Sequence, residues 1–411
     1  MPKKFNYPLL ENAFSNDDIN KAMQVLKSKY ITMSKKTKEF EKYFAQKLNT
    51  KHALMVNSGS SAVLLAFALL TNIKRKRRLK KGDEVLVPAV CWSTTFWPIV
   101  QCGLKPKFID VDLKTYSPSY EIIKKNITKK TKGIVLVNVL GNCSEMDKIK
   151  KLLDKKGIML IEDNCESLGS KYKGKYLGTF GEVGAFSFYY SHQITSGEGG
   201  AVICKNDNDY KILCELRAHG WDRDYNQKNR SKFNFVNQGY NLRPLDLTAA
   251  IALNQFKRLS LFKNTRAFNR NAIIKTIKKS NTWNNQFNFF EPIKGLDPSW
   301  FGFPLLLNEK LINKKKFFLQ YLKKNGIESR PIISGNFTKQ ECIKNHNFKT
   351  NGRYSGADKV EKLGFFIGLP TRKIKPNTLE KLCKHLLKIS NFKFMIFNTF
   401  LFCKITTYYR S

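Results

Sequence analysis

The chain has 411 residues and 42% hydrophobic content, which excludes a disordered chain and predicts a globular protein of two domains. Its 73 lysines and arginines, set against 32 aspartates and glutamates, give a formal net charge of +41. Because the lysines are spread along the whole chain, this charge fits either a solvated basic surface or a general attraction of anions.

The N-terminal part predicts two helices followed by a strand, a turn and a third helix. Apolar residues recur at helical spacing over residues 17–29 and 36–48, and residues 53–56 form a short apolar run. The turn at 57–61 contains three serines and a glycine, and an apolar helical stretch follows at 62–70. A turn that leads into the positive end of a helix favours an anion, although plain tight connections show the same pattern.

Strands and helices then alternate along the chain. We predict strands at 84–88, 107–111, 133–140 and 158–161, and helices at 119–127 and 145–155. This alternation predicts an α/β fold with a mostly parallel sheet, in which ligands bind beyond the carboxyl ends of the strands. Trp92, Asp163 and Glu166 follow two such ends, where an aromatic also fits the core and acidic residues also fit a helix cap.

The segment 185–203 is the main clue to function. An apolar run at 185–190, which contains Ser187, predicts a buried strand, and a loop with His192 follows it. Three glycines then lead into a second apolar run at 201–203. Glycine allows positive φ and close approach of the backbone to a ligand, so we expect a binding site here.

The rest of the chain predicts two more helices and then a second domain. Helices are expected at 210–216 and 245–258, and the polar stretch between them holds His219, Arg223 and Asn241. The smaller domain is expected to have helices near 265–279, 311–324 and 376–390, and strands near 300–307 and 327–333, the last with Arg330. The predicted units are a large domain at 1–260, a small domain at 261–390 and an unassigned tail at 391–411.

These spaced segments together resemble the DegT/DnrJ/EryC1/StrS family of pyridoxal-phosphate (PLP) sugar aminotransferases, over roughly residues 5–390. The resemblance implies an aspartate-aminotransferase-like α/β fold, with a mostly parallel seven-stranded sheet in the large domain and a smaller α+β C-terminal domain. It also implies a homodimer, in which Asn241 reaches the cofactor phosphate of the partner. The other implied cofactor residues are Ser60 and Ser61 at the phosphate, Trp92 stacked on the ring, Asp163 on the pyridine nitrogen, Glu166 on the ring hydroxyl, and Ser187.

His192 departs from the family pattern S-F-x-x-x-K-x-x-x-x-G-E-G-G, because it occupies the lysine position. A lysine can bond covalently to PLP and an imidazole cannot, but an imidazole with a pKa of about 6.5 is a suitable base at neutral pH. The resemblance therefore implies a lyase that uses PLP and pyridoxamine phosphate (PMP). His192 would be its catalytic residue, and glutamate would be its amino donor.

The implied reaction is the 3-dehydration of a nucleotide-linked 4-keto-6-deoxyhexose in deoxysugar and lipopolysaccharide biosynthesis. The motifs look most like the branch that acts on GDP-linked 4-keto-6-deoxy-D-mannose, with His219, Arg223 and Arg330 as substrate-binding residues. A related branch that acts on CDP-linked sugars also has the histidine but carries an iron–sulfur cluster. Its cluster cysteines lie close together just after the glycine segment, whereas residues 217–243 here contain no cysteine, so we expect no cluster.

Other properties follow from composition alone. Nine scattered cysteines without a CxxC pair predict reduced thiols in a cytoplasmic protein without a metal site. We expect neither a signal peptide nor a membrane span, since no apolar run is long enough. Three alternatives stay open: the CDP-linked branch, a non-catalytic PLP-binding relative, and a nucleic-acid-binding protein suggested by charge alone.

Overall fold

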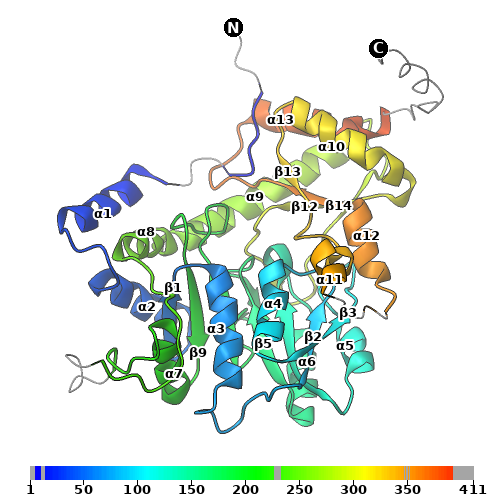
Figure 1. The fold of residues 1–411 in the computed structure, drawn as a ribbon. Coiled ribbons are helices and arrows are strands. Elements are labelled where there is room, and N and C mark those ends of the chain that lie inside the picture. Colours follow the sequence, from blue (N-terminus) through cyan, green and yellow to red (C-terminus); the bar gives the residue numbers. More distant parts are fainter. Residues whose placement is uncertain are drawn as a thin grey trace, which may run out of the picture.

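The computed structural model describes residues 5–10, 14–225, 233–346, 348, 350 and 352–391. Its largest element is a seven-stranded sheet with the strand order β1-β9-β8-β5-β4-β2-β3 (Figure 1). The strands are β1 (His52–Val56), β2 (Glu84–Pro88), β3 (Lys105–Ile109), β4 (Thr131–Val137), β5 (Met159–Asp163), β8 (Val183–Ser187) and β9 (Gly200–Cys204). Only β9 runs antiparallel to its neighbours, which confirms the predicted mostly parallel sheet.

Helices cover both faces of this sheet because successive side chains of a strand point to opposite sides. In β1, Leu54 and Val56 belong to one buried cluster, whereas Ala53 and Met55 belong to another. The first face packs against α3 (Gly59–Thr71), α4 (Ser93–Gln101) and α7 (Asp207–Arg217). The second face packs against α2 (Lys35–Leu48), α5 (Tyr120–Asn126), α6 (Met146–Lys156) and α8 (Asp246–Lys257).

A second, antiparallel sheet is formed by the C-terminal part of the chain. Its strands are β10 (Phe287–Phe289), β12 (Phe303–Leu307), β14 (Gly364–Ile367) and β13 (Ser329–Arg330), in the order β10-β12-β14-β13. With it lie α10 (Lys315–Lys324), α12 (Ser355–Leu363) and α13 (Pro376–Leu387), as Figure 1 shows. This arrangement confirms the predicted smaller α+β unit.

Helix α9 (Leu259–Lys278) runs from α8 towards α13 and so connects the two parts of the molecule (Figure 1). The predicted domain boundary at 260 falls at the start of this helix and stays a prediction. The remaining elements are α1 (Asn16–Lys27), α11 (Glu341–Asn345) and a small sheet of β6 (Lys171–Tyr172), β7 (Lys175–Tyr176) and β11 (Leu296–Asp297). Of the predicted tail at 391–411, residues 392–411 lie outside the described residues.

Several predicted elements have different bounds in the structure. The strand expected at 133–140 ends at Val137, and Val139–Gly141 form a short 3₁₀ turn in which Leu140 and Gly141 have positive φ values of 52° and 97°. The strand expected at 185–190 ends at Ser187, and the next residues form a loop in which Tyr189 and Tyr190 are exposed. The expected strand at 327–333 is reduced to Ser329–Arg330. None of the helices in the described part of the chain is long and apolar enough to span a bilayer.

Candidate active site

The turn between β1 and α3 brings hydroxyl groups and free backbone N–H groups to the carboxyl edge of the sheet. Ser58 is the N-cap of α3, and its Oγ accepts a hydrogen bond from the Ser61 N–H at 3.1 Å. The Ser60 hydroxyl donates to Thr94 Oγ1 of α4 at 3.0 Å. The first N–H groups of a helix have no partner within the helix and carry its positive dipole end, so this turn suits an anion such as a phosphate.

Gly59 allows this turn to approach the end of β8. A Cβ added at Gly59 would lie 2.4 Å from Cβ of Ser187, closer than two carbon atoms can come. Any side chain at Gly59 would therefore push the turn away from Ser187. The close approach places the start of α3, with Ser60 and Ser61, near Ser187.

Asp163 is the last residue of β5 and is only 5% exposed. Its Oδ2 accepts a hydrogen bond from the Thr95 hydroxyl at 2.6 Å, and its Oδ1 accepts one from the Cys165 N–H at 3.2 Å. A carboxylate can accept about four hydrogen bonds, so Asp163 keeps capacity for a further donor. Trp92, three residues before Thr95, is the N-cap of α4 and is 56% exposed, which leaves its aromatic ring available for stacking.

Glu166 lies beside this carboxylate, three residues further along the chain. Its Oε2 accepts a hydrogen bond from the backbone N–H of Leu140 at 3.0 Å. Burial raises the pKa of Glu166 to about 7, the nearby charge of Asp163 adds to this effect, and the Leu140 N–H opposes it. Near neutral pH this carboxyl group can thus either accept or donate a hydrogen bond.

His192 lies in the loop that connects β8 to β9 at the same edge of the sheet. Its ring meets Phe301 edge to face, with centroids 5.0 Å apart and an interplanar angle of 89°. Nδ1 is buried and has no hydrogen bond of normal geometry among the described residues. The next residue, Gln193, donates to the Glu166 and Ser299 carbonyls, and this anchors the loop.

The structure corrects the expectation that His192 has an ordinary pKa. Burial lowers the pKa of the imidazole to about 3, and the positive charge of Arg266 lowers it further, while the Tyr189 backbone opposes them. The ring is therefore neutral near pH 7, which is the form that accepts a proton, but it is a weaker base than an imidazole with a pKa of about 6.5. Once protonated, it would be a strong acid and would release that proton readily.

Asn241 lies close to the turn between β1 and α3 of its own chain. It forms a β-bridge with Ala218, and the adjacent Leu242 accepts a hydrogen bond from the Asn57 N–H at 3.1 Å. The Asn241 side chain is exposed and accepts a hydrogen bond from Arg243 Nε at 3.1 Å.

The three predicted substrate residues are not gathered around His192. His219 has a positive φ of 60°, its ring lies 4.8 Å from that of Trp221, and the Arg223 guanidinium stacks 4.8 Å from the same indole. In the described part of the chain, no hydrogen bond or ring contact links His219 or Arg223 to His192. Arg330 is exposed on β13 and pairs with Phe366 of β14, whose ring packs against Phe301.

The residues at the sheet edge fit PLP in their chemistry. The glycine–serine turn offers donors for a phosphate, Asp163 has free acceptor capacity, Trp92 presents an exposed aromatic face, and His192 Nδ1 is an unpaired polar atom. Within the described residues, no group of three or more histidine, cysteine or acidic side chains could hold a metal ion.

Some residues of the site were not assigned a role from the sequence. Thr95 holds Asp163, Thr94 holds Ser60, and Ser58 caps α3. The cap could have been inferred, because serine three residues before a helical N–H is a common capping pattern. The threonine contacts join α4 to α3 and to β5, which are far apart in the sequence, and only the fold reveals them.

Comparisons with known proteins show which proteins this chain resembles. The sequence profile described as the DegT/DnrJ/EryC1/StrS aminotransferase family matches residues 12–386. The chain is 38% identical over 375 residues to a GDP-4-keto-6-deoxy-D-mannose 3-dehydratase of Escherichia coli O55:H7, and the match covers 88% of this chain and 95% of that protein.

Solved structures of such enzymes are also similar. The E. coli GDP-4-keto-6-deoxy-D-mannose-3-dehydratase with bound hydrated PLP matches with a TM-score of 0.86 and 35% identity, over 94% of this chain and 99% of that one. A GDP-4-keto-6-deoxymannose-3-dehydratase with a trapped PLP–glutamate geminal diamine matches with a TM-score of 0.85 and 36% identity, over 93% and 100% of the two chains.

Proposed function

Because this chain belongs to the DegT/DnrJ/EryC1/StrS aminotransferase family, we propose that it is a PLP- and PMP-dependent 3-dehydratase of a GDP-linked 4-keto-6-deoxyhexose. The observation that carries this proposal is the position of His192, which occupies the loop after β8 where the family pattern has its lysine. Its unpaired, neutral imidazole can move a proton but cannot hold the cofactor covalently.

The cofactor, when bound, supplies an amino group for the sugar ketone and a protonated ring that accepts electrons. Trp92 would stack on this ring, and Asp163, oriented by Thr95, would keep the ring nitrogen protonated. Ser60, Ser61 and Ser187 would hold the phosphate, and Glu166 would hydrogen-bond the ring hydroxyl. These roles are supported by the position of each side chain at one edge of the sheet.

His192 would act first as a base and then as an acid. The neutral imidazole would take up the proton from the C4′ carbon of the cofactor, which must leave before the C3 hydroxyl can depart. The low pKa of His192 makes the neutral ring a weaker base than a free imidazole and makes the protonated ring a stronger acid. The protonated ring would pass its proton to the departing hydroxyl, which would leave as water. His219, Arg223 and Arg330 are proposed to bind the nucleotide sugar, since arginine forks suit diphosphate oxygens.

Purified protein incubated with glutamate and GDP-, CDP- or dTDP-linked 4-keto-6-deoxy sugars tests this function. We expect a 3-deoxy-4-keto product from the GDP-linked sugar, without a reductase and without stoichiometric iron or sulfide in the protein. The glutamate requirement is supported by the PLP–glutamate adduct of the similar enzyme. Turnover that needs a reductase, with iron present, would instead assign the chain to the cluster-containing branch.

We also propose a two-fold homodimer in which Asn241 serves the partner's cofactor. Large apolar side chains are exposed on the segments around the site, which favours a covering partner. They include Tyr189, Tyr190, Phe235 and Leu245.

The dimer makes a prediction for Asn241→Ala. This variant should weaken cofactor binding, measured by PLP absorbance after dialysis, while light scattering still reports a dimer. Lys257→Ala, on an exposed part of α8, is the control and should change neither measurement. A fully active monomer at assay concentration would contradict the proposal.

A further inference from the structure

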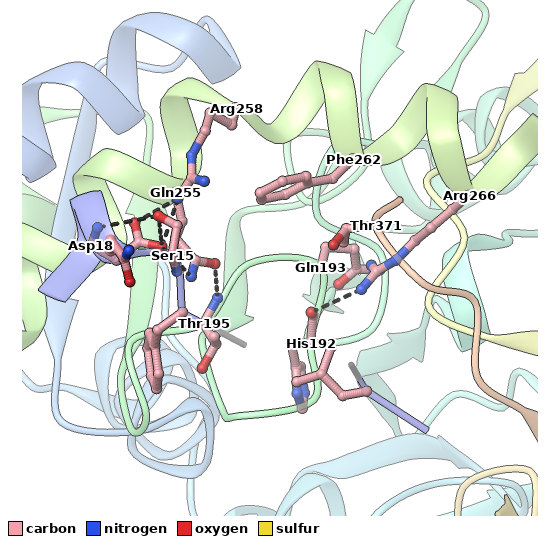
Figure 2. A pocket seen from close by; sticks show the side chains of 13 residues that line it. Ser15, Asp18, His192, Gln193, Thr195, Gln255, Arg258, Phe262, Arg266 and Thr371 are labelled. Atoms are coloured by element: carbon pink, nitrogen blue, oxygen red, sulfur yellow. Dashed lines mark hydrogen bonds and ion pairs between the residues drawn. The ribbon is translucent and has the colours of Figure 1, made fainter. Parts of the chain in front are cut away.

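Arg266 is a buried arginine behind the His192 loop. It lies on α9, is 2% exposed, and lines a cavity of about 400 Å³ together with Arg258, Gln193 and Thr371 (Figure 2). Within the described part of the chain, no carboxylate forms an ion pair with it. Burial accordingly lowers the pKa of Arg266 to about 10. A buried cation without a counter-ion is costly, so its retention needs a reason.

The guanidinium of Arg266 joins three segments that are far apart in the sequence. Nε donates to the Leu369 carbonyl at 3.0 Å, Nη1 to the Trp300 carbonyl at 3.3 Å, and Nη2 to the His192 carbonyl at 3.4 Å. Figure 2 shows the last of these bonds. One side chain thus ties the loop after β8 to the two chain segments that flank β12 and β14.

Two of these segments also determine how the imidazole packs. Phe301, next to Trp300, provides the edge-to-face contact with the His192 ring, and Phe366 of β14 packs against Phe301 at 5.7 Å. Displacement of Arg266 would therefore move both the backbone of His192 and its ring partner. Elsewhere in the loop, Gln193 and Thr195 form neutral hydrogen bonds, the latter to Gln255.

We propose that Arg266 is the positioning residue for His192, and that it holds the catalytic loop and places a positive charge behind the imidazole. This inference rests on the proposed dehydratase function, because it assigns Arg266 a role through His192. Arg266 itself is not proposed to touch substrate or cofactor.

The charged groups around His192 are few. Arg266 on α9 is the charged side chain that lowers the pKa of His192, after burial. Tyr189 of the same loop lies 5.8 Å away, ring to ring, and Phe301 carries no charge. Arg258 lines the same cavity, but Asp18 neutralises it through a bond of 2.7 Å. Glu166 meets the loop through its backbone carbonyl, and its carboxyl group bonds Leu140.

Arg266→Met and Arg266→Lys separate the effect of the positive charge from the effect of the three hydrogen bonds. Methionine removes the charge, so the pKa of His192 should rise and the acidic limb of the pH–rate profile should move to higher pH. Lysine keeps the charge but loses the three-way fork, so kcat should fall about 10²-fold, as for a misplaced catalytic group, with the acidic limb unchanged. KM for the sugar should change little in both variants.

Arg270→Met is the matched control. Arg270 lies one turn along the same helix, is 5% exposed and stacks 4.5 Å from the Trp300 ring. Its hydrogen bonds and its ion pair in the described part of the chain are made to Asn271, Phe290 and Glu291, outside the His192 loop. Its loss should cost stability but leave the pH profile and the pKa of His192 unchanged. Equal shifts in Arg266→Met and Arg270→Met would overturn the proposal.

An NMR titration with ¹⁵N-labelled histidine measures the pKa of the His192 imidazole directly. It compares wild type, Arg266→Met and Arg270→Met without any need for turnover. Resonances are assigned by their loss in His192→Asn. An upward shift of the pKa in Arg266→Met supports the proposal even if the dehydratase assignment fails, and an unchanged pKa overturns it. If Arg266→Met does not fold, a wild-type kcat in Arg266→Lys would also overturn it.

Discussion

His192→Asn is expected to abolish dehydration while the protein still binds its cofactor. Asparagine cannot take up the proton, and loss of a general base typically lowers the rate about 10²–10⁴-fold. Cofactor binding should persist because Ser60, Trp92 and Asp163 lie on other elements of the fold. Single-turnover loss of the sugar substrate measures the first effect, and PLP absorbance after dialysis measures the second.

His52→Asn provides the control for this experiment. His52 is at the start of β1, where it pairs with Asp207 at 2.7 Å and stacks on Tyr210. The variant should have near-wild-type turnover. If His192→Asn also retains near-wild-type dehydration, His192 is not the base and the proposed mechanism is wrong.

Asp163→Asn is expected to lower kcat about 10²-fold or more. The carboxylate is proposed to keep the ring nitrogen protonated, and removal of one partner of a buried charged pair costs about 3 kcal/mol or more, which corresponds to this loss of rate. The absorbance maximum of the bound cofactor should change as well, because the protonation of the ring changes.

Thr95→Val is a milder change at the same carboxylate, and its loss of kcat can be compared with that of Asp163→Asn. It removes the 2.6 Å hydrogen bond to Oδ2 but keeps the negative charge, so its kcat should fall by about 10-fold, as expected for a hydrogen bond to a charged group, which is worth about 1.5 kcal/mol. A larger loss in Thr95→Val than in Asp163→Asn would contradict the assignment of Asp163 to the ring nitrogen.

The sequence predicted the parallel sheet well because its strands are short apolar runs bounded by clear turns. The strand at 84–88 was predicted with its observed bounds, since Pro88 ends it and polar residues precede it. The predictions failed where the backbone adopts positive φ at a residue other than glycine, as at Leu140. They also failed where tertiary contacts decide, since Ser329–Arg330 pairs with β14 over only two residues.

The candidate site was predicted through its motifs, whereas its supporting contacts were not. The motifs identified Asp163 and His192 as candidates. Neither the hydrogen bond from Thr95 to Asp163 nor the hydrogen bond from Arg266 to the His192 carbonyl has a local sequence signal. These contacts join residues that are 68 and 74 positions apart. The same is true of the pKa of His192, which an isolated sequence cannot predict because burial is its largest cause.

The ratio of ammonia to 2-oxoglutarate, formed from glutamate and a GDP-linked 4-keto-6-deoxy sugar, tests the central claim most directly. A dehydratase removes the C3 hydroxyl of the sugar and converts glutamate to 2-oxoglutarate. It releases one ammonia for each 2-oxoglutarate. The variant His192→Lys restores the lysine of the family pattern and should lower this ratio. A wild-type ratio of one, with an unaltered ketone at C4, is the result we predict. A ratio near zero, with an amino group on C4 of the sugar, would contradict the account, because the protein would then be an aminotransferase.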